Sequence, residues 1–147
     1  AKAAVAGYEI ASLTAGDAEL VNKRWPYGGP HTLAMTIECI SDRPSAVARQ
    51  DGVAVAWAVT RNDGSVGMVH TEPDHRKRGL ASAVVGSIVA QLHHQGQIPF
   101  FYIEKGNVGS ESIATKLGFS PVMDSGYSWL HFDAIPAANA PLSKTNP

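Results

Sequence analysis

The spacing of apolar residues changes at about residue 80, and this change separates two kinds of predicted element. Upstream, most apolar residues lie in short runs that end at glycine, asparagine, aspartate or proline, which is typical of strands joined by turns. Downstream, Leu80, Val84, Ile88 and Leu92 recur every four residues, and Gly96 follows them. This spacing predicts a long, half-buried helix that ends near the glycine.

Two turn signals, QDG at 50–52 and NDG at 62–64, divide three apolar runs at 45–49, 53–61 and 65–71. An Asp-Gly pair between runs of strand type favours a tight hairpin, because glycine accepts the positive φ that such turns require. Two hairpins in succession predict an antiparallel meander of three strands.

Two shorter helices are predicted before these strands. The first begins at a capping box formed by Thr14 and Asp17 and ends in the turn-forming stretch WPYGGP. Its inner face would consist of Ala18, Val21 and Trp25. The second is marked by Leu33, Ile37 and Ile40, because these apolar residues repeat at helical spacing.

After the long helix, the pattern predicts three more strands and one more helix. The strands are PFFYIE, FSPVM and YSWLHF, at 99–104, 119–123 and 127–132, and the helix covers 109–117. With a first strand at 8–13, the predicted order is β-α-α-β-β-β-α-β-α-β-β. This order predicts an α/β or α+β domain.

Composition favours a single domain at residues 1–133. The chain has 147 residues, of which 44% are hydrophobic and 17% charged, and this supports one core of ordinary size. Residues 134–147 hold few large apolar groups, so we expect a flexible tail there. Because the chain starts at Ala1 rather than at methionine, we expect a processed product or an excised domain.

Charge and cysteine content exclude several classes of function. The formal net charge is -1 and the pI is about 6.7, so no broad positive field attracts nucleic acid or an anionic membrane. No apolar run approaches the ~20 residues that a membrane-spanning helix needs. The single Cys39 and the adjacent His93 and His94 lack the spacing of metal ligands, so we expect no metal. We expect a reduced, intracellular location, cytoplasmic or alternatively mitochondrial.

The stretch EPDHRKRG, between a predicted strand and the long helix, has the features of an anion site. It places free backbone amides and the positive end of the helix dipole beside Arg76, Lys77 and Arg78. Gly79 lets a ligand approach the backbone closely. The stretch has neither the Gly-Lys-Ser/Thr of a P-loop nor the G-x-G-x-x-G of a dinucleotide site, which indicates a different phosphate ligand. The same residues also allow a simpler interpretation, a solvated basic turn.

Two motifs resemble signatures of the GNAT superfamily of N-acyltransferases. The first, similar to the acyl-CoA pyrophosphate loop of that superfamily, is P-x-x-R-x-x-G-x-A at Pro73, Arg76, Gly79 and Ala81. The second is NVGSESIATKLGF, which begins at Asn107. More narrowly, VNKRWPYGG, VAVAW, GMVHTEPDHRKRGLA and the late SW resemble the C-terminal domain of glycine N-acyltransferase-like proteins over roughly residues 20 to 133.

The resemblance implies the GNAT fold, a central mixed, mostly antiparallel sheet of about seven strands flanked by helices. Strands 4 and 5 would splay apart to admit the pantetheine arm of acetyl-CoA or another acyl-CoA. An amide near Val69 or His70 would polarise the thioester carbonyl. The coenzyme A site implied by the resemblance consists of Met68, Val69, His70, Thr71, Arg76, Lys77, Arg78, Gly79, Leu80, Ala81, Ser82, Asn107, Ser110 and Ile113.

The resemblance also implies that the usual proton-transfer groups are missing. Ser65 stands where many members have a general base, and Ala114 stands where many have a tyrosine as general acid. The replacement candidates for the catalytic base are Glu104, His70 and Glu72. Each also has a structural interpretation, such as an ion pair of Glu104 with Lys105 or Arg76.

These features predict an acyl-CoA-dependent N-acyltransferase that moves an acetyl or larger acyl group to a primary amine by direct attack in a ternary complex. Glycine or another small amine is the acceptor that the resemblance implies. One alternative is a catalytically reduced acyl-CoA-binding or sensor domain, and another is transfer to a protein N-terminus or lysine. We expect no nucleic-acid or membrane partner and a monomer or homodimer.

Overall fold

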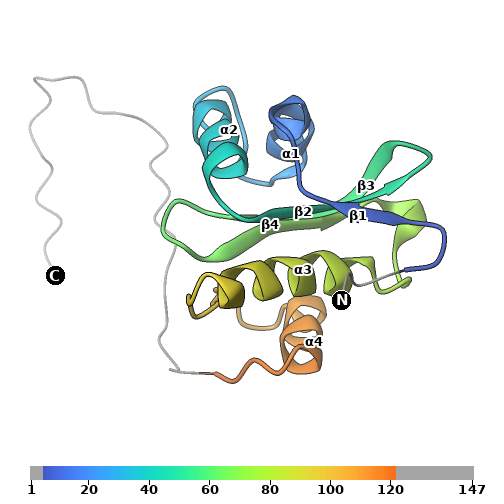
Figure 1. Cartoon of the computed structure of the whole chain (residues 1–147), viewed down its shortest axis with the longest axis vertical. Coiled ribbons are helices and arrows are strands. Elements are labelled where there is room, and N and C mark those ends of the chain that lie inside the picture. Colours follow the sequence, from blue (N-terminus) through green and yellow to red (C-terminus); the bar gives the residue numbers. More distant parts are fainter. Residues whose placement is uncertain (1–4, 122–147) are drawn as a thin grey trace, which may run out of the picture.

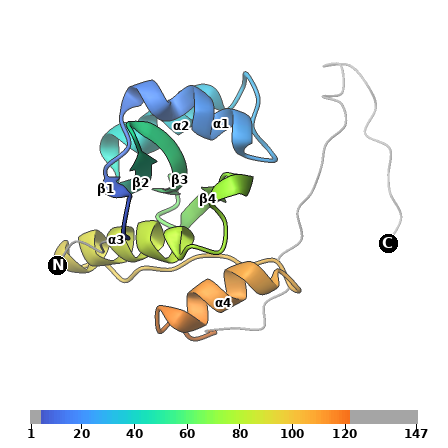
Figure 2. The ribbon, with the colours of Figure 1, turned by 90° about the vertical axis from the view of Figure 1, so that its right-hand side faces the viewer.

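The computed structural model describes residues 5–121, which form a four-stranded antiparallel sheet with helices on both faces (Figure 1). The strands, adjacent in this order, are β1 (Glu9–Ala11), β2 (Ser45–Gln50), β3 (Val53–Thr60) and β4 (Val66–Thr71). The helices are α1 (Ala18–Arg24), α2 (Leu33–Asp42), α3 (Leu80–His94) and α4 (Val108–Lys116), with the 3-10 turns η1 (Ala15–Asp17) and η2 (Pro73–His75). Figure 2 shows α1 and α2 over one face of the sheet, α3 over the other, and α4 beyond α3.

Both predicted hairpins are confirmed, and their turn residues explain why the chain reverses. Asp51 and Gly52 have positive φ angles of 50° and 81°, as a tight two-residue hairpin requires. In the second turn Gly64 has a φ of 88°. The three strands β2, β3 and β4 therefore form the predicted antiparallel meander, and β1 pairs with the outer edge of β2.

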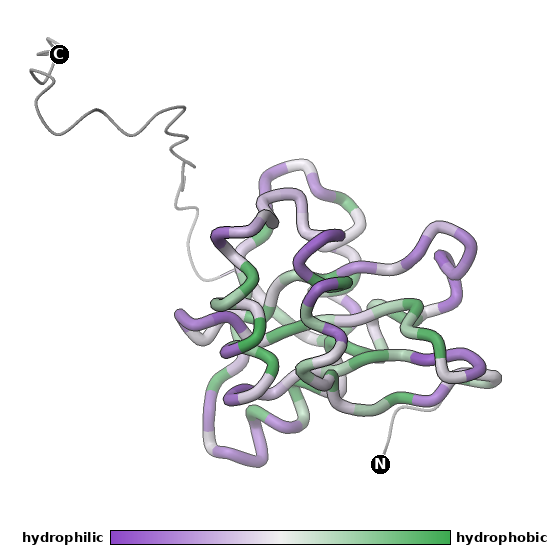
Figure 3. Tube along the Cα trace, turned by 90° about the horizontal axis from the view of Figure 1, so that it is seen from above, coloured by the Kyte–Doolittle hydropathy of each residue, from purple (hydrophilic) through white to green (hydrophobic). Residues whose placement is uncertain are grey.

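The sheet is buried on both faces, and the two faces carry side chains of different size. Towards α3, β2 and β3 present Ala46, Ala48, Val55, Ala56 and Ala58. Towards α1 and α2 they present Val47, Ala54, Trp57 and Val59. Short alanine side chains allow α3 to lie close to the strands, and the predicted inner face of α3 is fully buried there. Figure 3 shows the hydrophobic strands at the centre and the hydrophilic turns around them. No helix within residues 5–121 has both the length and the apolar character needed to cross a membrane.

Polar contacts fix α1 and the loop that follows it. Asp17 accepts hydrogen bonds from Thr14 N at 2.8 Å and Thr14 Oγ1 at 2.9 Å, which confirms the predicted capping box. The buried Asn22 donates from Nδ2 to Gly29 O at 2.9 Å and accepts from Thr32 Oγ1 at 2.7 Å. One amide side chain of α1 therefore fixes two points of the loop that follows this helix, Gly29 and Thr32.

The predicted second helix is confirmed as α2, but its buried face does not coincide with the apolar residues that identified it. Ile37 is 39% exposed, whereas Thr36 and Cys39 are fully buried beside Ile40. The Thr36 hydroxyl donates to Thr32 O at 3.0 Å, so its polar group is satisfied within the helix. Because a hydrogen-bonded threonine can be buried, the apolar spacing alone did not identify this face.

β4 meets the segment 99–104 at one point. Val66 N donates to Phe100 O at 2.8 Å, and no other backbone hydrogen bond joins the two segments in the described part of the chain. The prediction of a strand at 99–104 is therefore wrong. Side chains hold the segment instead, because Phe101 packs against the α3 core and lies 4.5 Å, between ring centroids, from Phe119.

The predicted helix at 109–117 is confirmed as α4. Residues 119–121 are not in a strand, and the rest of the strand expected at 119–123 lies outside the described residues, as do the strand expected at 127–132 and the tail at 134–147. The described residues therefore contain four antiparallel strands, and the mixed sheet of about seven strands stays a prediction.

Candidate functional site

β4 contains a bulge that begins two residues after Val66, the residue that bonds to the segment 99–104. The strand pairing places Met68 and Val69 together opposite the single residue Ala58. Met68 has a φ of 50°, and Val69 is 41% exposed. A bulge interrupts the hydrogen-bond ladder and redirects backbone groups, so this part of β4 can offer amides and carbonyls to a ligand.

The connection between β4 and α3 has the backbone of an anion-binding loop. Lys77 and Gly79 both have left-handed φ angles, 58° and 77°. Gly79 is the N-cap of α3 and provides no side-chain hydrogen bond to it. Within the described residues, the amides of Leu80, Ala81 and Ser82 have no hydrogen-bond partner. Three free amides at the positive end of a 15-residue helix favour an anion.

The loop itself carries three exposed cations, Arg76, Lys77 and Arg78. Arg76 Nε donates to Thr71 O at 3.1 Å, and an Nη of Arg78 lies 3.4 Å from Asp74 O. Both guanidinium groups therefore contact backbone carbonyls, and no carboxylate in residues 5–121 forms an ion pair with either of them or with Lys77. The structure brings the predicted phosphate-loop residues together on one exposed turn.

The second motif begins α4. Asn107 Oδ1 accepts a hydrogen bond from Ser110 N at 3.2 Å and so caps this helix. Ser110 is half-buried, and Ile113 packs against the α3 core. Ala114, at the position where many members of the resembled superfamily carry a tyrosine, is almost completely buried.

Two of the candidate bases, His70 and Glu72, lie together at the end of β4. Arg24 Nε of α1 donates to Glu72 Oε1 at 2.8 Å, and His70 Nε2 is 3.5 Å from the same oxygen. Burial alone would raise the pKa of Glu72, but the hydrogen bond and charge of Arg24 outweigh it, so the pKa is below its usual value. Burial lowers the pKa of His70, whose ring stacks on Trp57 with centroids 4.8 Å apart. Both groups are therefore held in their unprotonated forms at neutral pH.

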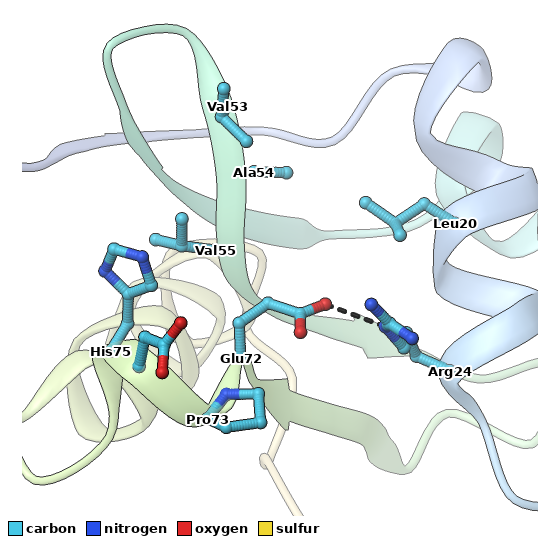
Figure 4. A pocket seen from close by; sticks show the side chains of 9 residues that line it. Leu20, Arg24, Val53, Ala54, Val55, Glu72, Pro73 and His75 are labelled. Carbon is cyan, nitrogen blue, oxygen red and sulfur yellow. Dashed lines mark hydrogen bonds and ion pairs between the residues drawn. The ribbon is translucent and has the colours of Figure 1, made fainter.

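The Arg24–Glu72 pair borders a cavity of about 400 Å³ (Figure 4). Its lining residues are Leu20, Arg24, Val53, Ala54, Val55, Glu72, Pro73, Asp74 and His75. Figure 4 shows Arg24 reaching from α1 to Glu72, with side chains of β3 opposite. Tyr8 Oη and His75 Nδ1 are 3.0 Å apart, which ties η2 to the chain before β1.

The third candidate base, Glu104, contacts a different element. Glu104 Oε1 accepts a hydrogen bond from Tyr27 Oη at 3.2 Å, and this carboxylate raises the pKa of the Tyr27 hydroxyl. The ion pairs considered for Glu104 with Lys105 or Arg76 are not formed in the described part of the chain. The contact joins the loop between α1 and α2 to the segment 99–104.

A polar cluster that sequence analysis missed lies at the start of β4. Ser65 is fully buried, and its Oγ donates to Asp63 Oδ1 at 2.6 Å and accepts from Arg61 Nε at 2.9 Å. Burial alone would raise the pKa of Asp63, but the hydrogen bonds from Ser65 outweigh it and lower the pKa. A Cβ built on Gly67 would lie 2.7 Å from Arg61 Nε, so the guanidinium occupies the space of the missing side chain. A glycine inside a strand signals such a close approach.

The only cysteine in the sequence is placed in the core. Cys39 of α2 is fully buried, and burial raises the pKa of its thiol. A buried, protonated thiol is a poor nucleophile, which agrees with the predicted packing role. In residues 5–121 no three His, Cys, Asp or Glu side chains come together as ligands for a metal ion.

The sequence of this chain matches one protein family and several characterised relatives. A model of the FR47-like protein family matches residues 46–129. Glycine N-acyltransferase of Mus musculus is 30% identical over 124 residues, and that of Homo sapiens is 27% identical over 124 residues. Both alignments cover 83% of this chain and 42% of the relative, so the chain spans less than half the length of these relatives.

Solved structures show the same fold. A Drosophila protein superposes with a TM-score of 0.72 at 23% identity, over 78% of this chain and 39% of that chain. The aminoglycoside N-acetyltransferase AAC(6')-Iy, in complex with a bisubstrate analog of CoA, superposes with a TM-score of 0.68 at 18% identity, over 85% and 99% of the two chains. The shared feature is an α+β arrangement of an antiparallel sheet and flanking helices.

Proposed function

Because this chain belongs to the FR47-like family, within the GNAT superfamily of acyltransferases, we propose that it transfers an acyl group from acyl-CoA to a small primary amine. The names of the relatives support glycine as the first acceptor to test. In this reaction the amine nitrogen forms a bond to the acyl carbon and the bond from that carbon to sulfur breaks. The amine loses a proton to a base, and coenzyme A leaves as the thiol.

The observation that supports the proposal is the succession of a bulge in β4 and an exposed, cationic loop at the start of α3. The bulge at Met68 and Val69 interrupts the pairing of β4 with β3 and leaves Val69 41% exposed, and the following loop ends in three amides without a partner in the described residues, beside exposed cations. This set fits a diphosphate at the loop and an extended arm along the strand. Bound acyl-CoA supplies a thioester, and an amide near Val69 or His70 would donate to its carbonyl oxygen.

Glu104 is our first candidate for the base. Glu104 is exposed, and its carboxylate accepts a hydrogen bond from the Tyr27 hydroxyl. By contrast, Arg24 engages Glu72, and His70 Nε2 is buried. Replacing Glu104 by Gln should lower kcat by about 100-fold or more if its carboxylate accepts the proton. Glu72→Gln and His70→Gln provide the parallel comparison, and an unchanged kcat in Glu104→Gln would move the role to one of them.

The enzymatic activity is tested by following free thiol with several acyl-CoAs and a panel of amines that includes glycine, a lysine-containing peptide and a peptide with a free N-terminus. We expect thiol release above background with a small amine. Release with peptides alone would instead favour a protein acetyltransferase. Absence of thiol release with every pair would contradict an enzymatic role.

The coenzyme A site is tested with Gly79→Glu. A Cβ at this position meets no atom within 4 Å, but a φ of 77° strains any residue other than glycine, and the carboxylate adds negative charge at the phosphate site. We expect calorimetry to show a loss of coenzyme A affinity of about 100-fold. Lys77→Gln, the matched control, removes one exposed cation and should lose less than about tenfold. Unchanged affinity in a folded Gly79→Glu variant would reject the phosphate loop.

An acyl-CoA-binding domain without turnover is the second candidate. The observation in its favour concerns the two positions where proton-transfer groups are usual. Ser65 is buried and its hydroxyl bonds to Arg61 and Asp63, and Ala114 is nearly inaccessible, so neither position offers such a group. Tight coenzyme A binding together with no turnover of any amine would favour it.

A further inference from the structure

The guanidinium of Arg61 is only partly used by the protein. Its Nε donates to Ser65 Oγ, but in the described residues neither Nη has a hydrogen-bond or ion-pair partner. Asp63 does not pair with it directly, because the Ser65 hydroxyl lies between the two side chains and bonds to both. The cation is therefore fixed in position while its two terminal nitrogens stay available.

The position of this cation is set by Gly67. A Cβ on Gly67 would be 2.7 Å from Arg61 Nε and 3.0 Å from Cζ, so the guanidinium lies directly against Gly67. Ser65, just before β4, and Gly67 within it lie on the same side of the chain, and Val66 between them packs on the opposite side into the α3 core. The next residue is the bulged Met68. A partly free cation thus lies one residue from the bulge, on the face that α1 and α2 cover.

We propose that Arg61 binds the carboxylate of an amino-acid acceptor, an inference that rests on the proposed acyl transfer. The two terminal nitrogens form a planar fork that matches the two oxygens of a carboxylate. In an α-amino acid one carbon separates the carboxylate from the amine. Anchoring the carboxylate over Gly67 would therefore hold the amine next to the bulge, where the thioester carbonyl is proposed to lie. Ser65 and Asp63 act as positioning residues for the guanidinium.

Two substitutions test this site in different ways. Arg61→Gln removes the charge. Gly67→Ala keeps the charge but places a methyl group where the guanidinium lies, and because no positive φ is required at Gly67, alanine should be tolerated by the backbone. Lys23→Gln removes a positive charge from the exposed face of α1 and serves as the matched control. Thermal melting of the whole chain checks that each variant is folded.

The first measurement is the ratio of kcat/KM for glycine to kcat/KM for glycinamide, with the same acyl-CoA. Using a ratio within each variant cancels the different basicity of the two amines. We expect Arg61→Gln and Gly67→Ala to lower the ratio by about 10- to 100-fold, mainly through the KM of glycine, and Lys23→Gln to leave it unchanged. A ratio that stays at the parental value in both folded variants would overturn the proposal.

The second measurement does not depend on turnover. Calorimetry in the presence of coenzyme A compares the parent's affinity for N-acetylglycine and for N-acetylglycinamide, which lacks the carboxylate. We expect at least tenfold tighter binding of N-acetylglycine, and the loss of that preference in Arg61→Gln. If the chain transfers no acyl group but keeps this preference, the proposed function fails and the carboxylate site stands. If it acylates both amines without any preference, the carboxylate site fails and the proposed function stands.

Discussion

Each end of β4 lies beside one arginine and one carboxylate, but the two pairs make different contacts. At its end, Arg24 donates directly to Glu72 at 2.8 Å, so cation and carboxylate satisfy each other. At its start, the Ser65 hydroxyl stands between Arg61 and Asp63 and bonds to both, at 2.9 and 2.6 Å. A direct pair mainly fixes the structure beside the cavity of Figure 4. A hydroxyl inserted into the pair fixes both side chains and still leaves the guanidinium able to bind a ligand.

The largest expected difference between the two ends of β4 comes from removing the indole ring of Trp57, which packs at the end of the strand. Trp57 is almost completely buried and stacks with His70, so Trp57→Ala should lower the free energy of unfolding by about 3–5 kcal/mol. Urea denaturation measures the change. Val53→Ala, on the same strand but 64% exposed, is the control and should change it by less than about 0.5 kcal/mol. A similar small change in both variants would mean that Trp57 does not support this end.

At the start of β4 the corresponding test is Ser65→Ala. The change removes the acceptor of Arg61 Nε and a donor to Asp63, both beside a fully buried position. We expect the free energy of unfolding to fall by about 1–3 kcal/mol and the pKa of Asp63 to rise toward its ordinary 3.8. NMR titration follows the pKa, and Ser41→Ala on the exposed side of α2 is the control. An unchanged pKa would show that the serine does not hold the carboxylate.

The end of β4 should also respond to pH through His70. Its pKa in the folded chain lies below the ordinary 6.5, so the unfolded chain binds a proton first as the pH falls. Stability should therefore decrease below about pH 6.5, by less than about 1 kcal/mol, while Asp63 at the start of the strand, whose pKa is lowered, stays ionised in this range. Urea midpoints at about pH 7.5 and about pH 5.5 measure the slope. His70→Gln should remove this part of the slope, and a slope that persists unchanged would assign it elsewhere.

The smallest expected effect is that of Arg24→Gln. The Arg24 side chain is 44% exposed, so losing the ion pair should cost under about 1 kcal/mol. Its charge nevertheless lowers the pKa of both Glu72 and His70, and we expect both pKa values to rise in the variant. NMR titration of the two side chains measures this. Because the cluster at the start of β4 is separate, the pKa of Asp63 should not move.

The sequence predicted the parts of the fold that depend on local residue patterns. Asp51 and Gly52 forced a turn by their own conformations, and the four-residue spacing of apolar side chains identified α3. It failed at 99–104, because whether an apolar segment becomes a strand depends on a partner that local pattern does not reveal. The predicted phosphate-loop residues are brought together on one turn, and their role in binding coenzyme A stays a prediction. Arg61 was missed because it reaches Ser65 and Gly67 only after the hairpin forms.

Because Cys39 is buried, its reaction with a thiol reagent would report local opening of the folded chain. Since the only thiol is sealed between α2 and the sheet with a raised pKa, the folded protein should be silent toward thiol reagents. Any fast signal in a thiol assay then comes from released coenzyme A. A slow signal that stops at one equivalent of protein would instead measure how often α2 lifts from the sheet. The unreactive Cys39 thus lets one thiol assay distinguish catalytic turnover from local opening of α2, which covers the proposed acceptor site.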